Sequence, residues 1–189
     1  ETRVRAGVKL EVDGFTDPIT GLILSVPDAG EAQLNRVYLK QGRSVQPWSA
    51  DEVVLSDTFA DAHGFQPGDT LAAIINGKRK RLTVVGVAVS PEYVYQIAPG
   101  AMFPDFKRYG VLWMGRSALA AAYDMEGAFN QISLTLARDA REQDVIDRVD
   151  AVLATYGGTG AYGRDDQFSN RFLSEELKQL QTMATVFPA

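Results

Sequence analysis

Cysteine is absent from this chain of 189 residues, and histidine occurs once, as His63. The lack of thiols excludes a disulfide framework, thiolate zinc sites and cysteine nucleophiles. The single imidazole excludes a histidine-rich metal site, and no serine lies in the G-x-S-x-G turn that would suit a Ser-His-acid triad. Because Gly64 follows His63 at the expected end of a short helix, we expect the imidazole to meet the last helical carbonyls. The sequence predicts no catalytic residue and no metal site.

Long apolar runs and an excess of basic residues are also missing. No run approaches the roughly 18 to 20 apolar residues that span a bilayer. A formal net charge of −5 and an isoelectric point near 4.9 leave no dense positive surface for nucleic acid. The 46% of hydrophobic and 23% of charged residues are typical of a folded domain. We expect one full core or two small lobes, and no nucleic-acid partner.

Hydrophobic periodicity predicts a chain rich in strands. Asn76 and Gly77 are the pair that a type I′ hairpin prefers, and Ser56 and Gly64 suit the N-cap and the C-terminal stop of a short helix. The order of elements predicts an α+β fold. We expect strands at 4–12, 22–26, 36–39, 52–55, 70–75, 79–89, 111–114 and 132–136, and helices at 56–62, 117–123, 144–156 and 172–187.

Two short motifs suggest ligands, but their contexts argue against this. Gly158, Gly160 and Gly163 match G-x-G-x-x-G, yet a helix precedes them and polar residues follow, whereas a dinucleotide site needs a strand before and a helix after. We therefore expect a loop and no cofactor. The basic run 78–81 begins at a hairpin turn, where alternation sends its side chains to opposite faces. We interpret it as solvated charge protecting a strand edge rather than as a nucleic-acid or anionic-lipid patch.

The C-terminal stretch predicts an amphipathic helix that continues past the given sequence. Its apolar residues recur at steps of four and three, which places them on one stripe. No Gly, Asn or basic last turn ends the helix before Pro188, and the chain opens on Glu1 without an initiator Met. We expect an excised segment of a longer protein, with the stripe as a stalk or partner contact. The stripe consists of Leu173, Leu177, Leu180, Ala184 and Phe187.

An enzymatic alternative starts from the long aromatic loop 90–110. Glu92 and Asp105 lie in this loop among five aromatic residues, and glycosidases use two carboxyl groups that flank a sugar. The alternative function is a secreted glycoside hydrolase or a carbohydrate-binding module that uses this loop.

A longer set of motifs resembles a known family. The stretch EVVLSDTFADAHGFQPGDTLAAIINGKRKRLTVVGVAVSPEYVY holds a strand and short helix, then G-x-x-x-G-D at Gly64 to Asp69, a hairpin turn, and V-V-G at Val84 to Gly86. Downstream, GVLWM, GAFNQISLTL, the helix at 144–156 and SNRFLSEELKQLQTMATVFPA continue the pattern. The sequence resembles the extracytoplasmic (periplasmic) core domain of FtsX-like and MacB-like ABC transporter permeases.

The resemblance implies a two-lobed α+β domain. A strand and helix lobe would comprise residues 1–55 and 129–189 next to the membrane stalks, and residues 56–128 would form an inserted β-rich lobe. The loop 90–110 is longer than the corresponding loops of MacB-like members.

The resemblance also implies a function without catalysis or cofactor. The domain would lie outside the cytoplasm, periplasmic or on the cell surface, as part of a bacterial cytoplasmic-membrane protein. It would couple ATP hydrolysis to export, or to an envelope partner, by mechanical transmission through stalk helices. Its implied partners are its own transmembrane helices, a second permease subunit, a cytoplasmic ATPase subunit and an envelope protein. Recruitment of a cell-wall hydrolase is a further possibility within the family.

Overall fold

A computed structural model describes residues 1–186 and divides the chain into two compact units, Glu1–Ser133 and a second unit that starts at Leu134. Four α-helices lie within the described residues, two in each unit. The expected mixture of strands and helices is confirmed.

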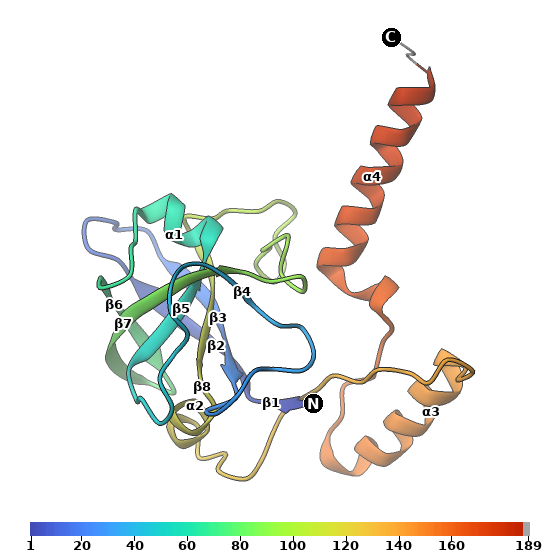
Figure 1. Ribbon diagram of the computed structural model, residues 1–189, viewed down its shortest axis with the longest axis horizontal. Helices are drawn as coiled ribbons and strands as arrows, with labels where there is room; N and C mark the ends of the chain where they lie inside the picture. Colours follow the sequence, from blue (N-terminus) through green and yellow to red (C-terminus); the bar gives the residue numbers. More distant parts are fainter. Residues whose placement is uncertain (187–189) are drawn as a thin grey trace. The chain divides into compact units, whose positions relative to one another are not determined.

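The first unit is a closed, mixed β-barrel (Figure 1). Six strands form the ring in the order β7-β5-β8-β3-β2-β6, and β6 pairs again with β7. The pairs β3–β8 and β5–β7 are parallel, while the other pairs in the ring are antiparallel. The strands of the ring are β2 (Arg5–Glu11), β3 (Ile19–Val26), β5 (Glu52–Ser56), β6 (Thr70–Ile75), β7 (Lys78–Val89) and β8 (Tyr109–Gly115).

The barrel interior holds the main hydrophobic core. Every strand of the ring contributes alternate apolar side chains to one buried cluster, which includes Leu10, Ile23 and Leu112. Helix α1 (Asp57–His63) adds Phe59, and helix α2 (Arg116–Ala122) adds Leu119, both without exposed surface. Figure 1 shows α1 and α2 at opposite ends of the barrel, where they close the core.

A second apolar layer covers part of the outer surface. Alternate residues of β3, β5 and β8 point outward, yet they are buried, as Leu24 and Trp113 illustrate. Partly buried residues of the long connections pack on them, among them Val45 before β5 and Tyr93 after β7. The strands β3, β5 and β8 are therefore apolar on both faces, which explains their nearly continuous hydrophobic sequences.

The hairpin and the short helix end as their turn residues predict. Asn76 and Gly77 both have positive φ, 46° and 74°, as a type I′ turn requires. Gly64 closes α1 in the left-handed region with φ 73°. The prediction for Ser56 is wrong in one respect, because its side chain makes no capping hydrogen bond. Its hydroxyl instead donates to Oε1 of Gln96 at 2.8 Å and so ties the long loop to β5.

Several strands differ from their predicted extent; β3, for example, begins three residues before the expected 22–26. The strand expected at 4–12 is β2, and a separate short strand, β1 (Thr2–Arg3), precedes it. The strand expected at 36–39 is β4 (Tyr38–Gly42), which pairs only with the second half of β7. The strand expected at 132–136 shrinks to β9 (Gln131–Ile132), which pairs with β1. Beyond Ile132, β1 offers no further partner residues, and Leu134 and Leu136 are exposed.

The observed units do not follow the predicted lobes. Residues on both sides of the expected boundary at 55/56 belong to one ring, since β2 pairs with β6 and β5 pairs with β7 and β8. The boundary between the compact units instead falls after Ser133 in the chain. Backbone pairing between distant strands decides this division, and sequence periodicity does not report it.

The second unit is helical. It comprises α3 (Glu142–Leu153), a 3₁₀ turn at Ala154–Tyr156, a second at Arg164–Asp166, and α4 (Phe168–Val186). Gly157 ends the first 3₁₀ turn with φ 77°. The glycine motif lies in the connection between the two turns, and the element directly before it is a 3₁₀ turn, so the loop interpretation is confirmed. Helix α4 begins four residues earlier than predicted.

Candidate functional site

The stripe on α4 is the candidate functional surface. Leu177 and Leu180 are 51% and 58% exposed, Ala184 is exposed and Leu173 is half-buried. Phe187 lies outside the described residues. Met183, 55% exposed, extends the apolar surface beside the stripe. The predicted residues that the structure describes thus share one helix face that presents apolar area.

Two hydroxyl groups of α4 are satisfied within the helix. The hydroxyl of Thr182 donates to the carbonyl of Lys178 at 2.9 Å, and that of Thr185 donates to the carbonyl of Gln181 at 3.0 Å. These hydroxyl groups are satisfied without a partner molecule. The surface can therefore act through burial of apolar area, and it carries no reactive group.

The start of α4 is organised by a residue that sequence reasoning missed. Oε1 of Gln167 accepts the backbone N–H of Asn170 at 2.8 Å, in the manner of an N-terminal cap. The rings of Phe168 and Phe172 pack with centroids 5.6 Å apart. A polar residue three positions before Asn170, at the head of an amphipathic run, is the signal that could have identified this cap.

Helix α3 adds further exposed apolar surface to the second unit. Its inner residues Val145, Ile146 and Val149 are only half-buried, and Val152 is 66% exposed. Among the described residues of this unit, Ser169 alone is buried. The second unit therefore has little core of its own.

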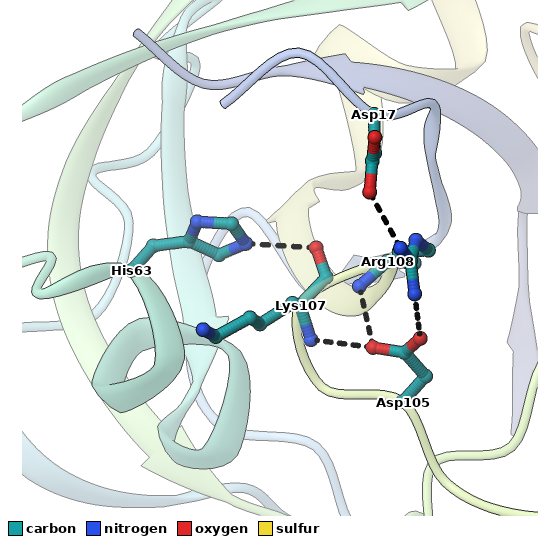
Figure 2. Close-up of polar contacts among 5 residues, drawn as sticks. All are labelled: Asp17, His63, Asp105, Lys107 and Arg108. Carbon is teal, nitrogen blue, oxygen red and sulfur yellow. Dashed lines mark hydrogen bonds and ion pairs between the residues drawn. The ribbon is translucent and has the colours of Figure 1, made fainter. Parts of the chain in front are cut away.

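His63 fastens α1 to the long loop instead of capping its own helix (Figure 2). Its Nε2–H donates to the carbonyl of Lys107 at 2.9 Å, and its ring packs against Phe15 and Phe59 at centroid distances of 5.1 and 4.7 Å. The expected contact with the last helical carbonyls is wrong, because the backbone N–H groups of Gly64 and Phe65 occupy those carbonyls. His63 has the surroundings of a structural residue.

The two carboxyl groups of the glycosidase alternative are each held by an arginine. Arg108 binds Asp105 at 2.9 Å and Asp17 at 2.5 Å, as Figure 2 shows. The hydrogen bond from Arg108 lowers the pKa of Asp105, whereas a general acid needs a raised one. Glu92 forms an ion pair with Arg3 and is largely buried. This arrangement favours structural roles for both carboxylates.

Neither a ligand pocket nor a metal site stands out in the described part of the chain. One cavity of about 20 Å³, lined in part by Arg3, Ser25 and Trp113, has room for little more than one water molecule. Among residues 1–186, no group of three or more histidine, aspartate or glutamate side chains could hold a metal ion. Within the same residues, no helix combines the length and apolar character that crossing a bilayer requires.

The chain matches no family model and no curated protein sequence. It is structurally similar to an ABC transporter domain. The solved structure is described as the extracellular domain of the noncanonic ABC-type transporter YknZ from Gram-positive bacteria. The likeness has a TM-score of 0.48 at 13% sequence identity, and it covers 85% of this chain and 76% of that chain.

Proposed function

We propose that the chain is a non-enzymatic extracytoplasmic domain of a bacterial ABC transporter permease. Its barrel bears the motifs on which the sequence resemblance depends: the G-x-x-x-G-D turn leads into β6, Asn76 and Gly77 form the hairpin turn, and V-V-G lies within β7. The exposed stripe on α4 is the single observation that carries the proposal. A regular amphipathic helix with unburied leucines is suited to contact another helix.

The helix works as a relay in this proposal. ATP is hydrolysed by a cytoplasmic subunit, and the displacement reaches the domain through stalk helices. At 1.5 Å per residue, the 19 residues of α4 extend over about 28 Å, and hydrogen bonds along the whole helix make it stiff. Its stripe packs on the stalk of another membrane helix of the same permease or on a second permease subunit.

Charged substitutions on the stripe test the relay. In the complete transporter, Leu177→Glu with Leu180→Glu should abolish the coupling of ATP hydrolysis to transport, because two carboxylates cannot be buried in a helix contact without a partner. The thermal melt of the 189-residue chain should stay within about 1 °C, since exposed leucines contribute little to folding.

A matched control carries the same charge on the opposite side of α4. Gln179→Glu with Thr182→Glu adds two carboxylates away from the stripe, and coupling should be retained. Equal loss of transport in both double variants, or full transport with the stripe charged, contradicts the relay. A collapse of the melt in the stripe variant assigns the leucines to a local core.

A second candidate function is the engagement of an envelope protein through the long loop. Met102 and Phe103 at the tip of this loop are 77% and 73% exposed. Apolar side chains displayed on a loop are typical of partner contacts. Pull-down from envelope extracts with the wild-type chain and with Met102→Ser plus Phe103→Ser tests this role, and an unchanged set of captured proteins contradicts it.

A further inference from the structure

The outer face of β2, β6 and β7 differs from the rest of the barrel surface. Over β3, β5 and β8 a second apolar layer covers the outward side chains, but that layer includes no residue of β2 or β6. In the register of these strands, Lys9 lies opposite Ile74, which lies opposite Arg79. Two residues further along each strand, the next row on this face consists of Glu11, Ala72 and Arg81. The strands thus present two parallel rows to the outside.

The basic run at the hairpin sends its side chains to both faces of the strand, as the sequence predicts. Strand β6 pairs with Lys78 to Thr83 along one edge of β7, whereas β5 pairs with the other edge only from Thr83 onward. Alternation sends Arg79 and Arg81 outward, where they join Lys9 from β2. We call these three exposed cations the basic face. By strand spacing and rise, their Cα atoms lie within about 12 Å of one another.

The basic face carries a surplus of positive charge on an acidic protein. Glu11 pairs with Arg79 at 2.8 Å, while Lys9 and Arg81 have no ion pair within the described residues. Three cations and one carboxylate leave a local charge of +2 on a chain whose formal charge is −5. Unpaired cations gathered on one face attract an anionic partner and repel a cationic one.

The shape of this face favours a flat partner. Between the cations lie the half-buried Ala72 and Ile74, and open space surrounds the position that a Cβ would take on Gly7. Gly7 has no side chain and Ala72 only a methyl group, so these positions supply no walls that could enclose an acidic peptide. A layer of lipid headgroups is the flat anionic surface that such a face can meet.

We propose that the basic face binds the anionic phospholipid headgroups of a bilayer through Lys9, Arg79 and Arg81. The presence of a bilayer beside the domain rests on the proposed function, whereas the binding itself is a property of the described face. Each lysine or arginine near an anionic membrane raises the affinity about fivefold. The contact would orient the barrel toward the membrane surface.

Sedimentation with lipid vesicles tests the proposal on the 189-residue chain. We expect the chain to sediment with vesicles of equal parts phosphatidylglycerol and phosphatidylcholine at about 0.05 M salt, and to be released at about 0.5 M salt. Vesicles of phosphatidylcholine alone should not bind it. The variant Lys9→Gln, Arg79→Gln, Arg81→Gln should bind the anionic vesicles about a hundredfold more weakly, since three fivefold contributions are lost.

A charge-matched control separates the face from net charge. Arg138, Arg141 and Lys178 are exposed cations of the second unit, and changing all three to glutamine removes the same charge. This variant should bind like the wild type. Equal losses in both triple variants, or equal binding to both vesicle types, overturn the proposal. Binding to soluble polyglutamate without vesicle binding also overturns it and points to an acidic polypeptide. None of these outcomes bears on transport coupling through α4, so the two proposals fail separately.

Discussion

Gly110 at the start of β8 shows how tightly α1 seals the barrel. A Cβ on this residue would lie 2.8 to 3.0 Å from three atoms of the Phe59 ring. Phe59 has no exposed surface and cannot yield without disturbing the core. The fit of a helix against the strands therefore depends on the absence of one methyl group.

We expect Gly110→Ala to lower the free energy of unfolding by about 1–3 kcal/mol through overpacking. Gly7→Ala is the matched control, because it places the same methyl group into open space on β2. Gly7→Ala should leave stability unchanged or raise it by about 0.5 kcal/mol. Urea denaturation measures both, and equal stability of the two variants would contradict the packing argument.

Glu52 gives the molecule an acid-sensitive contact. Its carboxylate accepts two hydrogen bonds from Arg43, at 2.7 and 2.6 Å, and one from the backbone N–H of Gln46 at 2.7 Å. The hydrogen bonds from Arg43 lower the pKa of Glu52 despite some opposing desolvation. These contacts fix the connection that precedes β5.

The pH dependence of stability follows from this lowered pKa. Above the ordinary pKa of about 4.3, Glu52 is ionised in both folded and unfolded chains, so its contribution is fully present. The contribution is lost as the pH falls through the lower pKa of the folded state. Glu52→Gln should cost about 1 kcal/mol at pH 7, reduced by solvent screening, and the difference should vanish in acid. Glu126→Gln, at an exposed carboxylate, should show no such difference in urea titrations at either pH.

The sequence predicted the roles of residues that act through their own backbone or close neighbours. It did not predict the contacts of residues whose partners are distant in the chain. Gly64, Asn76 and Gly77 act through their own backbone conformations, which the sequence reports directly. His63 and Ser56 bind groups 44 and 40 residues away. The sequence identifies them as polar groups beside a helix, but only the fold decides what they meet.

At the scale of elements, the long loop between β7 and β8 has two separable parts. Gln96 and Ile97 are 3% and 9% exposed and hold the loop on the barrel, whereas Met102 and Phe103 project from it. Deleting the whole loop would therefore remove structural contacts together with any partner surface.

We expect Ile97→Ala to lower the free energy of unfolding by about 2 kcal/mol or more, because a buried branched side chain leaves a cavity. Met102→Ser with Phe103→Ser should change it by less than about 0.5 kcal/mol. Thermal melts of both variants make the comparison. A strong loss of stability in the tip variant would show that the tip belongs to the core.

Strand existence was predictable from the sequence, whereas strand partners were not. The apolar runs of β5 and β8 identify them as strands, but parallel pairing of β3 with β8 joins residues about 90 positions apart. At 132–136 the sequence predicted a strand that is mostly absent from the structure. Its alternation is regular, yet Leu134 and Leu136 have no partner strand among the described residues and remain exposed. A strand forms only where an alternating apolar sequence also finds an adjacent strand for backbone hydrogen bonds.

At the scale of the whole molecule, the two units differ in how many side chains they bury. The barrel contains two buried clusters, while the described part of the second unit buries only Ser169. Burial of apolar area is the main source of folding stability. The units should therefore open independently.

Hydrogen exchange measured by mass spectrometry tests this difference. Amides of α3 and α4 should exchange at least tenfold faster than amides of β3 and β8, because opening the second unit exposes little buried area. A chain ending at Ser133 should keep the protection of the barrel strands. Loss of that protection, or uniform exchange across all 186 described residues, would contradict two independent units.

The fold class was predictable from the sequence, but the closing of the strands into a barrel was not. Strands followed by helices indicated an α+β chain, and the resemblance supplied an expectation of lobes. Closure of the ring requires β6 to pair with both β2 and β7, a condition set by long-range geometry. The candidate stripe was predictable because helical periodicity is local. The basic face was not, since Lys9 and Arg79 meet only through strand register.

The ladder of β1 and β9 has a mechanical consequence. The N-terminal ammonium of Glu1 donates to the carbonyl of Ser133 at 2.7 Å, and the N–H of Ser133 donates back at 2.8 Å, so both ends of the ladder leave on the same side. Tension between Glu1 and the segment after Ser133 would peel these bonds apart one by one rather than shear them together. Peeling breaks these few bonds one at a time, whereas every strand of the ring is paired on both sides. The junction would thus yield first under load and spare the barrel from unfolding.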